Sequence, residues 1–132
     1  LLVGMTETFT TNPEAALASA NIIGFLLTDG SAVIAGVTES GGTATTVTFD
    51  DTTKSTLADD TYVTLGFKAT TGNSTNVVKF YINRQEVGSS TTNIPTANLK
   101  LTAMSLSGDA TGTKATTIDY ITASQDRNVS YE

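Results

Sequence analysis

The amino-acid sequence predicts an all-β fold, an antiparallel two-sheet β-sandwich, and three observations support that prediction. Threonine fills 27 of the 132 positions, and this β-branched residue suits the pleated, half-buried surface of a sheet. Charged residues make up only 15% of the chain, against about 25% in an average domain. Short runs of alternating apolar and polar residues follow one another, with turn-forming residues between them. We therefore expect one sandwich domain over residues 1–127 and a polar tail at 128–132.

The first twenty residues contain a strand pattern and a helical pattern. Residues 1–6, LLVGMT, are predicted to be the end of a strand whose start lies before Leu1, so we expect a longer gene product. Asn12 can cap a helix, and Pro13 suits the first helical position. These residues predict a short helical connector near residues 13–19, which would be marginally stable on its own.

Two turns divide the next part of the chain. The run IIGFLL at 22–27 is apolar on both faces, as is typical of a strand buried on both sides. Asp29-Gly30 follows this run and predicts a two-residue hairpin, because both central residues of a type I′ turn have positive φ. The stretch ESGG at 39–42 predicts a second turn, and a polar loop is expected over 50–60.

Period-two alternation assigns side chains to the core face of the later strands. Over 61–70 and 77–82 these side chains are Val63, Leu65, Phe67, Ala69, Val78, Phe80 and Ile82. In LKLTAMSLS (99–107) the side chains of Leu99, Leu101 and Ala103 are expected to face inward. A change of phase at Met104 then predicts a bulge. Residues 116–124, TTIDYITAS, are expected to form the closing strand of eight or nine.

Composition excludes several kinds of chemistry. The chain has no His and no Cys, which removes Ser-His-Asp and Cys-His catalysis and thiolate metal sites. Its net charge of −6 and scattered basic residues argue against nucleic acid and anionic membranes as partners. Glycoside hydrolysis needs two carboxyl groups about 5 to 9.5 Å apart, and no predicted strand carries two acids on one face. We therefore expect a protein that is not an enzyme and holds no cofactor.

The polar loop offers a candidate calcium site. Asp50-Asp51 and Asp59-Asp60 would supply oxygen ligands of the kind that calcium prefers. Aspartate pairs in such loops more often bond their own backbone and shape turns. We therefore expect no bound metal.

Exposed aromatic side chains would favour a different function, the binding of glycans. Sugar rings stack on Trp or Tyr, and the chain has four Tyr and no Trp. The candidates for sugar contact under this alternative are Tyr62, Tyr81 and Tyr120. Asp119, next to Tyr120, is either part of such a site or a surface acid beside a packed ring.

The second half of the sequence resembles a known family. The segments TYVTLGFKAT, VVKFYIN and TTIDYITAS are similar to those of small concanavalin A-like (laminin G-like) sandwich proteins of tailed-bacteriophage virions, over about residues 60–127. The resemblance implies a jelly-roll sandwich whose first and last strands are adjacent. Arg84 stands where the Phe-Tyr-x-Asn-Gly hairpin of such proteins has Gly. We therefore expect a longer turn over residues 83–86, because Arg disfavours the positive φ of a two-residue turn.

The resemblance also implies a function. It implies a virion structural protein, a capsid decoration or cement protein on the capsid surface, which forms a homo-oligomer and binds other virion proteins. Contact is expected through surface patches and an edge strand. The candidate contact residues are Arg84, Gln85 and Glu86 at the turn, and Leu1, Leu2 and Val3 on the expected edge strand. The alternative function is a glycan-binding, lectin-like module on a phage or cell surface.

Overall fold

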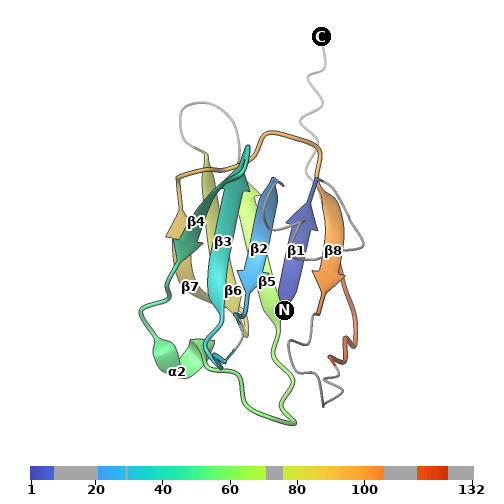
Figure 1. Ribbon diagram of the computed structural model, residues 1–132. Helices are drawn as coiled ribbons and strands as arrows, with labels where there is room; N and C mark the ends of the chain where they lie inside the picture. The colour runs from blue at the N-terminus through green and yellow to red at the C-terminus, as the bar shows by residue number, and fades with distance from the viewer. Residues whose placement is uncertain (8–20, 29, 71–75, 106–115, 125–132) are drawn as a thin grey trace.

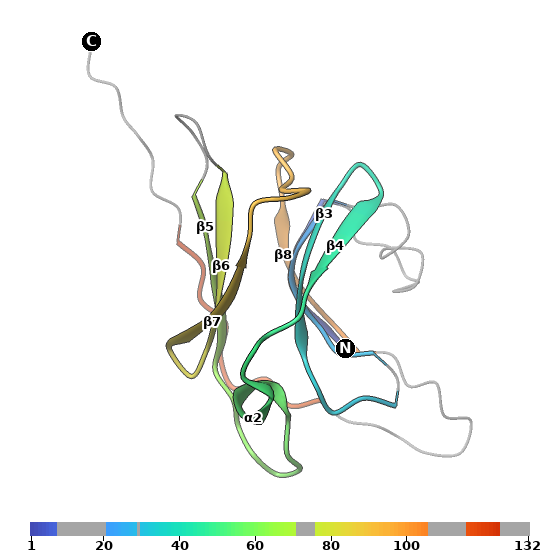
Figure 2. The same ribbon diagram turned by 90° about the vertical axis from the view of Figure 1, so that its left-hand side faces the viewer.

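The protein is a sandwich of two antiparallel sheets that face each other (Figures 1 and 2). The computed structural model describes residues 1–7, 21–28, 30–70, 76–105 and 116–124. The predicted all-β, two-sheet architecture is confirmed, whereas the jelly-roll connectivity stays a prediction. The expected helix at 13–19 and the tail at 128–132 lie outside the described residues.

The two sheets differ in width, five strands against three. The wide sheet has the order β4-β3-β2-β1-β8, with β1 (Leu2–Thr6), β2 (Ile22–Leu26), β3 (Ala35–Ser40), β4 (Thr43–Val47) and β8 (Lys100–Met104). The narrow sheet has the order β5-β6-β7, with β5 (Leu65–Thr70), β6 (Val77–Ile82) and β7 (Gln85–Ser90). The first strand, β1, therefore lies inside the wide sheet, between β2 and β8.

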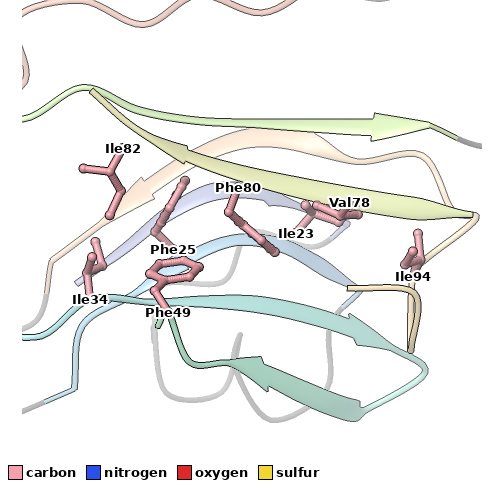
Figure 3. Close-up of a cluster of buried hydrophobic side chains, with 8 residues drawn as sticks. All are labelled: Ile23, Phe25, Ile34, Phe49, Val78, Phe80, Ile82 and Ile94. Atoms are coloured by element: carbon pink, nitrogen blue, oxygen red, sulfur yellow. The ribbon is translucent and has the colours of Figure 1, made fainter. Parts of the chain in front are cut away.

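The core between the sheets is built around three phenylalanine rings. The ring of Phe25 on β2 meets the ring of Phe80 on β6 edge-on, with centroids 5.4 Å apart. Phe49 lies 6.1 Å from Phe25 and 5.9 Å from Phe80 between ring centroids. Buried aliphatic side chains complete the cluster (Figure 3): Ile23, Ile34, Val78, Ile82 and Ile94.

Two glycines make room for these rings. A Cβ atom on Gly36 would lie 2.9 Å from the Phe80 ring, and one on Gly88 would lie 2.9 Å from the Phe49 ring. Both approaches are closer than a methyl group and a ring carbon can pack. The two sheets therefore reach their observed separation only because these positions have no side chain.

Alternation predicted the core face of the narrow sheet well. Val78, Phe80 and Ile82 are buried as expected, and Leu65 and Phe67 pack against the same cluster. Ala69, the last inward residue predicted for this strand, is exposed. The prediction fails there because the core does not extend to the end of β5.

Strand β8 shows where the prediction of burial was wrong. Leu101 pairs with Met5 and so shares a face with the core, but 48% of Leu101 is exposed. The buried residues of β8 are Thr102 and Met104, which point to the outer face of the wide sheet. The register with β1 is continuous through Met104, so the expected bulge is absent up to that residue. Alternation gave the correct face, but the narrow sheet does not cover that face here.

The turns correct two predictions and confirm one. Gly41 and Gly42 both have positive φ between paired Ser40 and Thr43, so the turn expected over residues 39–42 is a two-residue hairpin. In contrast, the pairing of β2 and β3 ends at Leu26 and Ala35. The connection between the two strands therefore spans residues 27–34 rather than two residues. Within it the Ser31 N–H donates to the Thr28 carbonyl oxygen at 3.3 Å and Gly30 has a φ of 73°, so a turn does lie at this point; Asp29 itself lies outside the described residues.

The turn at Asn83-Arg84 is shorter than expected. Ile82 pairs with Gln85, and the two residues between them have φ of 50° and 67°. Thr64 holds Asn83 in this conformation: its N–H donates to Asn83 Oδ1 at 3.0 Å, and its carbonyl accepts from the Asn83 N–H at 2.8 Å. These bonds hold Asn83 in its positive-φ conformation. The same hairpin contains a register shift between Phe80 and Tyr81, where Val87 of β7 has no partner on β6.

Two further segments differ from expectation. The loop at 50–60 contains a one-turn helix, α2 (Thr52–Ser55), whose N-terminus is capped by the Asp51 side chain. Residues 116–124 were expected to be the closing strand but form no strand. Among the described residues, no backbone hydrogen bond joins this segment to a sheet.

Strands β1 and β2 approach each other closely at Gly4 and Gly24. A Cβ on Gly24 would lie 2.5 Å from the Val3 carbonyl oxygen and 2.8 Å from the Gly4 Cα. We expect Gly24→Ala to lower the free energy of unfolding by about 3 kcal/mol or more, because backbone must move to admit the methyl group. The measurement is urea unfolding followed by circular dichroism.

Gly66→Ala is the matched control for this variant. A Cβ there meets no atom within 4 Å, so its unfolding free energy should stay within about 0.5 kcal/mol of the parent. Equal stability of the two variants would show that the close approach of β1 and β2 does not constrain the sheet.

Candidate functional site

The candidate site is a groove along the side of the sandwich, where the β1 and β8 strands of the wide sheet extend past the β5 edge of the narrow sheet. Its volume is about 640 Å³. One wall is residues 62–67, which lead into and along β5; the other is the segment 117–124; the floor is the core-side face of β1 and β8. In Figure 1 this segment lies beyond β8, and in Figure 2 it lies on the side of β5.

The floor of the groove is apolar. Val3 and Met5 pair with Phe25 and Ile23, so all four side chains lie on the core side of the wide sheet. Leu101 continues this face on β8, opposite Met5. The narrow sheet covers the β2 part of this face and leaves the β1 and β8 part open.

Exposed apolar side chains gather at this groove. Six large hydrophobic residues are exposed in the described part of the chain. Five of them line the groove: Tyr62, Leu101, Ile118, Tyr120 and Ile121. The sixth, Val33, lies elsewhere. A contiguous apolar surface rimmed by polar residues is typical of a binding site.

The β5 wall also presents unpaired backbone groups. Both backbone groups of Thr64 point toward Asn83, on the side of β6. Because the direction of these groups alternates along an antiparallel strand, those of Leu65, Phe67 and Ala69 point to the opposite side. That side is the edge of the narrow sheet, and for Leu65 and Phe67 it faces the groove.

The groove carries little charge. Among the described residues that line it, Asp119 is the only ionisable side chain apart from the two tyrosines. The other polar residues of the lining include Thr64, Thr117 and Thr122. The groove therefore suits a neutral or weakly basic ligand rather than an anion.

The structure brings together two of the three tyrosines predicted for glycan contact. Tyr62 and Tyr120 are 73% and 63% exposed and line the same groove. Tyr81 is half-buried on β6, opposite Gly66, and is not part of the lining. Asp119 lies beside Tyr120 in the groove wall.

The predicted protein contacts divide into an exposed turn and a strand that is not at an edge. Arg84, Gln85 and Glu86 are exposed as expected, and Glu86 pairs with Lys79 at 2.9 Å. The edge-strand assignment of residues 1–3 is wrong, because β1 has a partner on each side. Leu2 is buried, and the Leu1 amino group donates to the Leu27 carbonyl oxygen at 3.0 Å. Only the side chain of Val3 reaches the groove.

Asp51, one of the four loop aspartates, bonds the local backbone. Asp51 Oδ1 accepts the N–H groups of Thr53 and Lys54 at 3.1 and 3.3 Å, and its Oδ2 lies 3.0 Å from Lys54 Nζ. These contacts, the Lys54 side chain first, lower the pKa of Asp51. No group of three His, Cys, Asp or Glu in the described ranges is placed to hold a metal ion. In the same ranges no helix is long and apolar enough to cross a membrane.

Sequence reasoning missed three groove residues, Leu101, Ile118 and Ile121. It assigned Leu101 to the core and the other two to a closing strand. The available signal was the pattern itself: TTIDYITAS places apolar side chains on both faces, which a strand at an exposed edge rarely does.

Comparisons with protein-family models, with curated proteins and with solved structures gave no match to this chain. The resemblance to phage virion proteins therefore stays a prediction from the residues.

Glu39 is a buried carboxyl group on the outer face of β3, away from the groove. Burial raises its pKa above the ordinary value, so the folded state binds this proton more tightly than the unfolded state. Its contribution to stability is then greatest below the unfolded-state pKa and decreases as the pH rises through the raised folded-state pKa.

We expect Glu39→Gln to be more stable than the parent near pH 7, because a neutral amide replaces a buried carboxylate. The difference should disappear near pH 3, where both states of the parent carry a protonated carboxyl group. Thermal unfolding of the variant and the parent at both pH values measures this difference in stability. A Gln variant that is less stable near pH 7 would show that the carboxylate is stabilised in the fold.

Proposed function

We propose that this chain is a non-enzymatic structural protein of a tailed-phage particle, a capsid decoration or cement protein that binds another particle protein through the groove. The observation that carries the proposal is that, in the described part of the chain, five of the six exposed large apolar side chains gather in one groove. Burial of such side chains contributes about 25 cal/mol per Å² before the costs of association. The phage setting, the position on the capsid surface and the homo-oligomeric state rest on the sequence resemblance.

The turn at residues 84–86 is a second contact in this proposal. Arg84 is an exposed cation at the tip of the β6–β7 hairpin, and its side chain is free to reach a neighbouring subunit. The two-residue turn holds this tip in a fixed position relative to the narrow sheet. A contact of this kind adds specificity and association rate more than affinity.

The proposal is tested with purified particles of the phage that encodes the chain. Mass spectrometry should find the chain in the particles, and the isolated protein should cosediment with particles stripped of it. Leu101→Ser and Tyr62→Ser should each weaken cosedimentation about tenfold or more, since central apolar contacts dominate such interfaces. Absence of the chain from purified particles would overturn the proposal.

Val33→Ser is the matched control, because Val33 is also an exposed apolar residue but lies outside the groove. It should bind particles as the parent does. Arg84→Gly tests the turn separately: it should fold normally, because Gly favours the positive φ of this position. Particle binding that is unchanged in Arg84→Gly would remove the turn from the interface.

A second candidate function is glycan binding, favoured by the exposed tyrosines of the groove. Tyr62 and Tyr120 are both exposed and line the same groove, and Asp119 provides an acceptor for sugar hydroxyls beside them. The chain would then act as a lectin-like module on a phage or cell surface.

A glycan array distinguishes this candidate. Tyr62→Ala and Tyr120→Ala should abolish any oligosaccharide signal, whereas Tyr81→Phe, outside the groove, should keep it. An array without signal at high protein concentration would count against glycan binding and leave the structural role in place.

A further inference from the structure

We propose that the groove accepts an extended segment of another polypeptide, which adds to the free edge of β5 as a fourth strand of the narrow sheet. The inference rests on the proposed protein-binding function and specifies its partner: a single extended peptide of low charge. Strand addition of this kind gains affinity from main-chain hydrogen bonds and specificity from alternate side chains.

The backbone of β5 provides the first part of the argument. The N–H and C=O groups of Leu65, Phe67 and Ala69 point away from β6, as the bonds of Thr64 to Asn83 establish. Within the described ranges, these groups have no backbone partner. A row of such groups at every second residue is the template that an added strand needs.

The size of the groove provides the second part. The groove is lined by Leu65, Gly66 and Phe67 of β5. Because a strand rises about 3.3 Å per residue, this part of the edge is long enough to pair with about three residues of one added strand.

The second wall limits the kind of partner. The segment 117–124 stands across the groove from β5. It would block the edge of an already formed sheet, including β5 of a second copy, but leaves room for a lone extended segment. The partner is therefore a terminal or loop segment rather than a folded edge.

The residues that line the groove indicate which side chains the partner segment should carry. An added strand would direct every second side chain to the apolar floor at Val3, Met5 and Leu101. The intervening side chains would face solvent on the outer side of the narrow sheet. Asp119 is the only acid among the described lining residues, so one basic residue in the partner would be complementary.

The test is amide hydrogen exchange, measured by NMR, on the whole 132-residue chain. The probe is the synthetic peptide acetyl-Thr-Val-Lys-Val-Thr-Val-amide at millimolar concentration. We expect exchange of the Leu65 and Phe67 amides to slow about tenfold or more on peptide addition, because each outward N–H gains an acceptor. The Gly66 and Lys68 amides, already directed to β6, should change little.

Two controls make this result specific. The same peptide with its alternate amides N-methylated keeps the side chains but loses the donors, and it should not protect the edge. Leu101→Ser should weaken the protection by the parent peptide, whereas Val33→Ser should not.

Three outcomes would overturn the inference. Leu65 and Phe67 amides that are protected without peptide would mean that the chain covers its own edge. Protection that grows with protein concentration alone would mean that a second copy does so. Particle binding that depends on Leu101 without protection of these amides would reject strand addition but leave the proposed function intact. If the peptide protects these amides but the chain is absent from purified particles, strand addition would stand and the proposed function would be rejected.

Discussion

The contact of Phe25, Phe49 and Phe80 is the interaction on which the rest of the structure depends. These rings belong to both sheets and lie within 5.4 to 6.1 Å of one another between centroids. Tilted and edge-on ring pairs of this kind add about 0.5 to 1.5 kcal/mol each beyond the area that they bury. Gly36 and Gly88 have no side chain where these rings need space. The narrow sheet is thereby fixed over the β2–β3–β4 part of the wide sheet.

This placement leaves the remaining part of the wide sheet open. The β1 and β8 strands keep an apolar core-side face, yet no strand of the described chain lies over it. The groove is the direct consequence, and its apolar floor is a core face without a second layer. Exposure of such a surface to water is unfavourable, and covering it lowers the free energy, which is why we place the function there rather than at the exposed turn.

The sequence predicted which side chains share a face of each strand better than it predicted whether that face is buried. Val78, Phe80 and Ile82 were assigned correctly because a buried face imposes strict alternation. Leu101 was assigned to the correct face and the wrong environment, because alternation cannot tell whether a second sheet covers that face. The turn at Asn83-Arg84 was predicted too long, because the bonds that Thr64 gives to Asn83 come from a residue distant in sequence. Of the candidate site, Tyr62, Tyr120 and Asp119 were named in advance as possible glycan contacts, and Val3 as a protein contact on an expected edge strand.

The sequence by itself determined that this protein is an antiparallel two-sheet sandwich with no His and no Cys. Threonine content, short alternating runs and glycine turns are local properties, and local properties fix strands and their faces. Only the tertiary structure decided that β1 is an interior strand, that 116–124 stays outside the sheets, and that Tyr62, Leu101 and Tyr120 share one groove. All three of these features depend on which strands pair and on how far each sheet extends. That outcome is set by contacts between residues up to about a hundred positions apart, which no short stretch of sequence records.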